Sequence, residues 1–145
     1  MYLAGFTGSA TGIATAGGFQ NAKSGGGDAF LVKFDAATGN RVWATYYGGF
    51  ADDYGLNLTT DPSGNVYLAG QTGSTSNMAS AGGFKNTFGG GTDDAFLVKF
   101  DATTGNRIWA TYYGDAAFDA GNSVATDAAG NNIYMAGNTK SPAGI

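Results

Sequence analysis

Apolar and polar residues follow one another along this chain in short runs that turn residues separate, a pattern typical of β-strands. Four such runs stand out in the central part of the sequence, at Tyr54–Thr60, Val66–Thr72, Asp94–Phe100 and Arg107–Tyr113. Glycine and β-branched residues recur too often for helix, and no long apolar stripe has the helical period of 3.6 residues. The pattern therefore predicts an all-β fold.

Two turn sequences join these runs in pairs. They read Asp61-Pro-Ser-Gly-Asn65 and Asp101-Ala-Thr-Thr-Gly-Asn106. An aspartate at the start of a turn can accept hydrogen bonds from backbone amides further on, and Pro62 sets the φ angle that a type I turn needs. Glycine near the end can take the positive φ that closes a short hairpin. Each turn therefore predicts an antiparallel strand pair.

The same sequence occurs more than once. Residues 29–48 read AFLVKFDAATGNRVWATYYG, and residues 95–114 differ from them only at Thr103, for Ala37, and Ile108, for Val42. The run Tyr2–Ser9 returns at Tyr67–Ser74 and again at Tyr134–Ser141, at spacings of 65 and 67 residues. Such a fixed period indicates a repeat architecture.

The strands carry apolar side chains on both faces. Phe96 and Val98 alternate along one run, whereas Ile108 and Trp109 are adjacent in the next. Two-sided apolarity predicts a sheet that is covered on both faces. Four antiparallel strands per repeat, stacked sheet on sheet, form a blade of the β-propeller type, and such a blade needs neighbours to bury its faces.

A family resemblance runs through nearly the whole chain. The segments GNVYLAGQT, GGF, GGGTDDAFLVKFD and ATYYG, followed by D-x-G, a strand and D-x-x-GN, resemble in order and spacing the bacterial SBBP repeat, a seven-bladed β-propeller repeat. The sequence departs from that pattern where Thr-Gly-Ile (11–13) and Ser-Asn-Met (76–78) replace Asp-Phe-Pro, and it is too short for seven blades. The resemblance implies a propeller in a secreted or surface-exposed bacterial protein, and it implies no particular reaction.

The repeat boundaries predict an incomplete array. We expect one repeat region over residues 1–145, with repeat 1 at 2–66, repeat 2 at 67–133 and the start of repeat 3 at 134–145, or nine strands in about two and a quarter blades. Open edges attract further strands. The chain is then a piece of a longer array, a subunit that builds a ring or filament with copies of itself, or a self-contained domain. Because both ends hold the same repeat position, an open helical assembly is favoured over a simple closed ring.

Composition narrows the possible chemistry. The chain has no histidine, cysteine or glutamate, and all eleven acidic residues are aspartates. The usual general base, the soft metal ligands and the thiol nucleophile are therefore missing, which disfavours an enzyme. The seven basic residues are scattered and the net charge is −4, so we expect no nucleic-acid partner. No apolar run is long enough to span a membrane.

Two long connections, at residues 10–27 and 75–93, are the candidate binding segments, because long loops without regular structure are often functional. Phe19, Phe84 and Phe88 are the candidate apolar anchors for a ligand or partner; Phe19 and Phe84, which occupy the same place in the two copies, are expected rather to pack between blades. Phe88 aligns with Lys23, which makes it the better candidate for a surface anchor. The glycine runs lack the Lys-Ser/Thr and the helix start of a phosphate loop.

Asp28, Asp94, Asp53 and Asp119 are weak candidates for a Ca²⁺ site, because each precedes a strand at a repeated position. No cofactor is otherwise expected, and the aspartate turns have an explanation in turn chemistry alone. Together these features favour a non-enzymatic structural or adhesive repeat module of an exported, extracellular or cell-surface bacterial protein, which assembles with itself or with further repeats. The alternative is a propeller that binds a glycan or protein through the two long loops.

Overall fold

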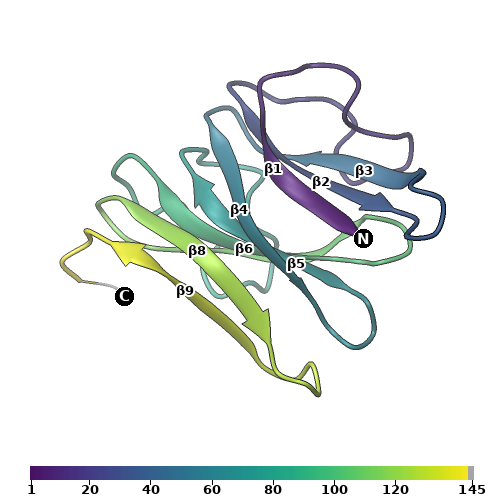
Figure 1. Ribbon diagram of the computed structural model, residues 1–145. Coiled ribbons are helices and arrows are strands. Elements are labelled where there is room, and N and C mark those ends of the chain that lie inside the picture. Colours follow the sequence, from purple (N-terminus) through teal and green to yellow (C-terminus); the bar gives the residue numbers. More distant parts are fainter. Residues whose placement is uncertain (144–145) are drawn as a thin grey trace.

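The computed structural model describes residues 1–143, which form nine strands in three antiparallel sheets (Figure 1). The first sheet contains β1 (Tyr2–Thr7), β2 (Asp28–Phe34) and β3 (Arg41–Tyr47), in that order. The middle sheet contains β4 (Asp53–Thr60), β5 (Val66–Thr72), β6 (Asp94–Phe100) and β7 (Arg107–Tyr113). The third sheet contains β8 (Asp119–Thr126) and β9 (Ile133–Thr139).

The predicted all-β fold of antiparallel blades is confirmed. Three of the four predicted central strands have the predicted bounds, and β4 begins at Asp53, one residue earlier than expected. The described residues contain no helix, and hence none that could cross a membrane. The predicted third repeat, residues 134–145, extends two residues beyond the described part of the chain.

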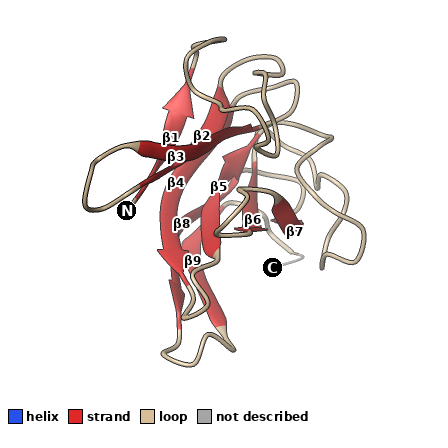
Figure 2. Cartoon of the chain, turned by 90° about the vertical axis from the view of Figure 1, so that its right-hand side faces the viewer, coloured by secondary structure: helices blue, strands red, loops and turns tan. Residues whose placement is uncertain are grey.

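The three sheets are stacked in chain order, so that the middle sheet lies between two partial ones (Figures 1 and 2). One apolar cluster fills the junction between the first and middle sheets and includes Leu31, Tyr47, Leu68 and Phe96. A smaller cluster, around Tyr67 and Val124, joins the middle sheet to the third. The middle sheet thus buries apolar residues on both faces, as the two-sided pattern of its strands requires.

Equivalent residues of consecutive repeats point in the same direction along the stack. Leu31 of β2 faces the middle sheet, and its counterpart Leu97 of β6 faces the third sheet. The opposite face of β6 carries Phe96, which packs back onto the first sheet. Every junction is therefore built from the same two kinds of face, one at each side of a blade.

Candidate functional site

The two long connections close the outer edges of the first and middle sheets. In residues 10–27, the amide of Thr15 donates to the carbonyl of Ala44 (2.9 Å), and the amide of Tyr46 donates to the carbonyl of Gln20 (3.0 Å). In the same way, residues 75–93 donate a backbone amide hydrogen bond to the carbonyl of Ala110 and accept one from the amide of Tyr112. An edge strand otherwise offers free backbone groups to other chains. The loops therefore protect β3 and β7 from unwanted pairing.

The three candidate phenylalanines lie in different surroundings. Phe19 is half-buried between the first and middle sheets, with the guanidinium of Arg107 4.5 Å from the centre of its ring. Its counterpart Phe84 is 80% exposed and has one aromatic neighbour, Tyr113, at 6.0 Å between ring centres. Phe88 is half-buried and packs against Tyr112 at 6.1 Å.

This distribution differs from the expectation that Phe84 would be packed and Phe88 would be on the surface. The reason lies in the neighbouring sheet rather than in the loop. Phe19 is covered by β6 and β7, and its ring lies 6.4 Å from that of Phe100. Among the described residues, the third sheet has no counterparts of these two strands, so nothing covers Phe84.

Phe84 belongs to a larger uncovered surface, which we call the open face. A pocket of about 390 Å³ lies beside it, lined by Phe84, Leu97 and Trp109 together with the loop glycines. The equivalent residues of the first sheet are Phe19, Leu31 and Trp43, and all three pack against the middle sheet. The open face is therefore the counterpart of a surface that elsewhere in the chain is an interior junction.

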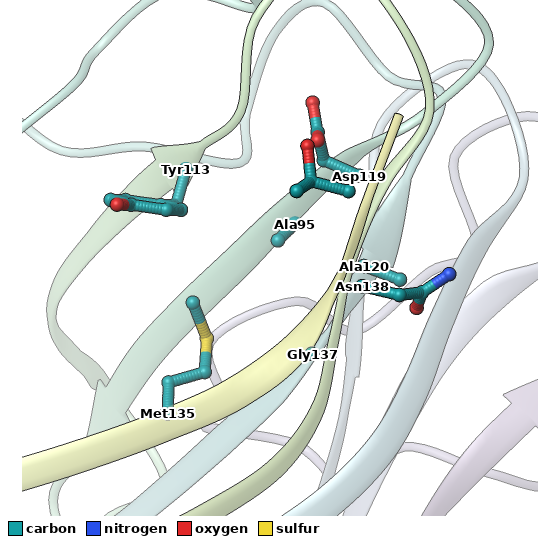
Figure 3. Close-up of a pocket in the computed structure, with 8 residues that line it drawn as sticks. Ala95, Tyr113, Asp119, Ala120, Met135, Gly137 and Asn138 are labelled. Atoms are coloured by element: carbon teal, nitrogen blue, oxygen red, sulfur yellow. The ribbon is translucent and has the colours of Figure 1, made fainter. Parts of the chain in front are cut away.

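A second pocket, of about 250 Å³, lies on the same side of the molecule, between β6 and β7 and the third sheet (Figure 3). Tyr113 and Ala95 line it from the middle sheet, and Met135 and Gly137 line it from β9. Asp119 stands at its upper end in this view.

The candidate aspartates come together in pairs, one pair at each junction. A Cβ atom placed on Gly48 would lie 2.7 Å from a carboxylate oxygen of Asp28 and 2.7 Å from one of Asp53, so the two side chains flank this glycine. Asp53 accepts hydrogen bonds from the amide of Gly49 (2.8 Å), the hydroxyl of Ser74 (2.9 Å) and the hydroxyl of Thr72. Asp28 accepts from the Gln20 amide (2.7 Å), but its Oδ1 has no partner.

The second pair, Asp94 and Asp119, has a different neighbour. Asp119 accepts from the hydroxyl of Ser141 (2.7 Å) and the amide of Asp115 (2.9 Å). Burial raises the pKa of Asp94, and the ammonium group of Lys85, which occupies the repeat position of Gln20, offsets part of that rise by charge attraction. Each pair thus has a lysine nearby, Lys23 for Asp28 and Lys85 for Asp94, and only Asp28 also accepts a hydrogen bond from a side-chain amide, that of Gln20.

Burial controls the ionisation of these carboxyl groups. It raises the pKa of Asp53 to about 6, because the loss of water outweighs the hydrogen bonds from Thr72, Gly49 and Ser74. Burial also raises the pKa of Asp28 and of Asp94. For Asp119, burial opposes ionisation, but hydrogen bonds from Thr139 and Ser141 outweigh it and lower the pKa.

Within residues 1–143, no three acidic side chains gather closely enough to hold a metal ion. Ca²⁺ prefers six to eight oxygen ligands, and each aspartate pair supplies only two carboxylates, which already accept hydrogen bonds from the chain through at least one oxygen each. Calcium binding at these pairs therefore stays a prediction from the sequence.

Comparison with protein-family models gives two matches to one family, described as the SBBP β-propeller repeat, at residues 42–76 and 108–142. Residues 42–76 and 108–142 are therefore SBBP repeats. Each SBBP match runs from the last strand of one sheet through the first two strands of the next, β3–β5 in one case and β7–β9 in the other. The SBBP unit therefore spans a junction between blades, and both copies contain its buried aspartate, Asp53 or Asp119. No curated protein matches the chain.

The sequence pointed to the aspartates and the long loops of the SBBP units but not to the open face. Trp43 and Trp109 have nearly the same neighbours in sequence, with Val42 in one copy and Ile108 in the other, and this difference does not indicate that Trp43 is buried and Trp109 half-buried. The only sequence signal was the repeat count. Strands with the sequences of β6 and β7 occur twice within residues 1–145, whereas three copies of the strand that precedes them occur there. Nothing in the sequence indicated that Arg107 would lie against the ring of Phe19.

Proposed function

We propose that this chain is a non-enzymatic structural module that builds by stacking SBBP blades. The observation that supports this proposal most directly is the complete middle sheet, which is covered on both faces by partial sheets of the same design. Each partial sheet keeps the faces and edges with which a blade meets its neighbours. Further repeats, in this chain or in a second copy, present the strands that fit them.

The long loops support a structural role as well. Their backbone groups form hydrogen bonds with the edges of β3 and β7, and Met78 of the second loop is fully buried in the junction. The carbonyl of Met78 accepts a hydrogen bond from the Tyr47 hydroxyl (2.6 Å). A low charge content and many Gly, Thr, Asn and Asp residues favour an exported, extracellular or cell-surface module.

A second candidate function is the binding of a glycan or another protein by loop 75–93. Phe84 favours it, because an 80% exposed aromatic ring beside the half-buried Trp109 is a surface on which a sugar ring could stack. A glycan array would test this: specific binding that the Phe84→Ala variant loses supports the candidate, and an array without binders removes it.

The structural proposal is tested by measuring the mass and shape of the purified 145-residue chain. Light scattering coupled to gel filtration should give masses above that of one chain, rising with concentration, and negative-stain electron microscopy should show rings or filaments of regular width. A folded chain that stays monomeric at 100 µM or more, roughly the range in which weak interfaces saturate, would contradict the proposal.

A further inference from the structure

We propose that the open face receives strands β2 and β3 of a second copy of this chain, and that β9 takes the place of that copy's β1 beside β2. This inference rests on the proposed function and names its partner and geometry. In the resulting contact, β8 and β9 of one copy and β2 and β3 of the next make one complete four-stranded blade, stacked on the middle sheet of the first copy.

The identity of the occupant follows from the sequence of the strands that fill the equivalent place inside the chain. The surface around Phe19 is covered by β6 and β7. Strand β2 has the same sequence as β6, DAFLVKF, and β3 differs from β7 only in Val42 for Ile108. A second copy thus carries on β2 and β3 the buried side chains with which β6 and β7 make the internal junction.

The pocket in Figure 3 is the place of one such side chain. In the internal junction, the ring of Phe96 lies over Gly70 and 5.3 Å from the ring of Tyr47. Gly137 and Tyr113, which line the pocket, are the repeat counterparts of Gly70 and Tyr47. The counterpart of Phe96 is Phe30, so the pocket is shaped for Phe30 of the second copy.

The pocket beside Phe84 fits two further side chains of the same strands. Around Phe19, the ring of Phe100 and the guanidinium of Arg107 supply the contacts. Their counterparts are Phe34, at the end of β2, and Arg41, at the start of β3. Arg41 is exposed and is already held like Arg107, because it donates to the carbonyl of Gly12 (3.0 Å), as Arg107 donates to that of the equivalent Asn77 (2.7 Å).

The matching face is uncovered on the same molecule. Leu68, Phe96 and Phe100 of the middle sheet are fully buried against the first sheet. The counterparts of Phe96 and Phe100 on β2 are Phe30 and Phe34, which are half-buried, and Met135 of β9 takes the place of Leu3, which is 52% exposed, when β1 leaves. One chain thus displays both sides of a blade junction at opposite ends, which is the requirement for a head-to-tail contact that repeats along a filament.

The exchange of β1 for β9 follows from the strand registers. Strand β1 pairs with β2 so that Tyr2 faces Lys33, and β5 pairs with β6 so that Tyr67 faces Lys99. Strand β9 has the position of β5 in the repeat, so Tyr134 would face Lys33 of the second copy. Because Tyr2 already occupies that position, β1 must leave as β9 arrives; one ladder replaces another of similar length, as in domain swapping.

Cysteine pairs give a direct test, because the chain has no cysteine of its own. Residues directly opposite in an antiparallel ladder are close enough for a disulfide. Under mild oxidation, the K33C/Y134C variant should form covalent dimers, trimers and longer ladders on a non-reducing gel. A mixture of the two single variants should stop at dimers.

The Y2C/K33C variant is the matched control, because it uses the same lysine position and locks β1 in place within one chain. Its oxidised form should stay monomeric by light scattering and should assemble again when a reductant is added. Assembly of the oxidised Y2C/K33C variant, in which β1 is locked, would overturn this inference but not the proposed function. Assembled particles of K33C/Y134C without a crosslink between chains would do the same. A monomeric wild-type chain would overturn both.

Substitution of the two equivalent phenylalanines tests the open face separately. Phe84→Ala should raise at least tenfold the protein concentration at which assembly is half complete. It should leave the urea midpoint for unfolding of the dilute monomer unchanged. Phe19→Ala should lower that midpoint, since Phe19 packs inside the chain. If Phe84→Ala assembled like the wild type, the open face would not be the contact.

Discussion

Asp53 holds a carboxyl group in a place that water does not reach. It is fully buried, and the charge of the nearby Asp28 adds to the effect of burial in raising its pKa to about 6. In the unfolded chain the same group titrates near 4. The folded protein therefore binds a proton at Asp53 more tightly than the unfolded chain does, and stability is linked to pH through this residue.

We predict that the free energy of unfolding falls as the pH rises from about 4 to about 6.5. The contribution of Asp53 is fully present below the pKa of the unfolded chain and is lost as the pH passes the raised pKa of the folded one. A shift of about two units corresponds to at most roughly 3 kcal/mol. Urea unfolding at pH 4.5 and pH 7.0 measures the difference, and the carboxyl carbon resonance of Asp53 reports its titration.

Asp61 provides the opposite sign in a separate pH range. Burial opposes its ionisation, but hydrogen bonds from Asn65 and Lys99 outweigh it and lower the pKa to about 2. Its contribution is present above pH 4 and is lost as the pH falls toward 2. Stability should therefore be highest between pH 4 and 5, and a stability that rises steadily from pH 4 to pH 7 would contradict the assignment for Asp53.

Tyr47 offers a second prediction at the residue scale. Its fully buried hydroxyl donates to the carbonyl of Met78 (2.6 Å). Tyr47→Phe leaves that buried carbonyl without its donor and should cost about 1–3 kcal/mol of stability. The matched control is Tyr113→Phe at the equivalent position, which is only half-buried and should change the urea midpoint little. Equal losses in both variants would show that burial at the junction does not matter.

The hairpin turns show, at the scale of elements, how one sequence serves two surroundings. Gly39 and Gly105 lie near the end of turns that differ only in Thr103 for Ala37, with φ of +71° and +72°. A Cβ on Gly105 would lie 2.8 Å from the indole of Trp43, whereas a Cβ on Gly39 would meet nothing within 4 Å. The second turn is packed against the first sheet, and the first turn is free.

We therefore predict that Gly105→Ala destabilises the chain more than Gly39→Ala. Both variants bear the cost of a positive φ, about 1 kcal/mol, and only Gly105→Ala adds a clash with Trp43, which should contribute about 1–3 kcal/mol more. The difference between the two urea midpoints isolates that clash. If the two variants were equally stable, the turn at Gly105 would not rest on the indole ring.

Local sequence was enough to predict the elements of this fold but not the environment of each copy. Strand bounds and hairpins follow from alternation and turn residues, which act within a few positions, so they came out correctly for β5, β6 and β7. The exposure of Phe84 and the burial of Phe19 depend on whether a further sheet lies above them. That is a property of the stack, which the local sequence does not express.

The pairing of aspartates was missed for a similar reason. Asp28 and Asp53 are recognisable one by one from their place before a strand, but only the stacking of sheets brings both against Gly48. The substitution of Lys85 for Gln20 is visible in the sequence. That these two side chains lie beside Asp94 and Asp28 follows only from the fold.

At the scale of the whole molecule, the three sheets make a stack that ends in two complementary surfaces. The face of β2 that carries Phe30 lies at one end, and the open face with Phe84 lies at the other. The repeat counterparts of the residues on both surfaces are buried against each other inside the chain. Stability and assembly are then two effects of one kind of contact, and they should depend on each other.

This coupling predicts that the thermal midpoint of the chain rises with protein concentration. If each chain contributes one junction on average, a tenfold increase in concentration favours the folded, assembled state by about 1.4 kcal/mol per chain, or about 4 °C for a chain of this length. Differential scanning fluorimetry from 1 to 100 µM measures the slope. The oxidised Y2C/K33C variant cannot exchange β1 for β9, so its midpoint should not move with concentration, and reduction should restore the slope. A wild-type midpoint that is the same at all concentrations would show that the two ends do not meet.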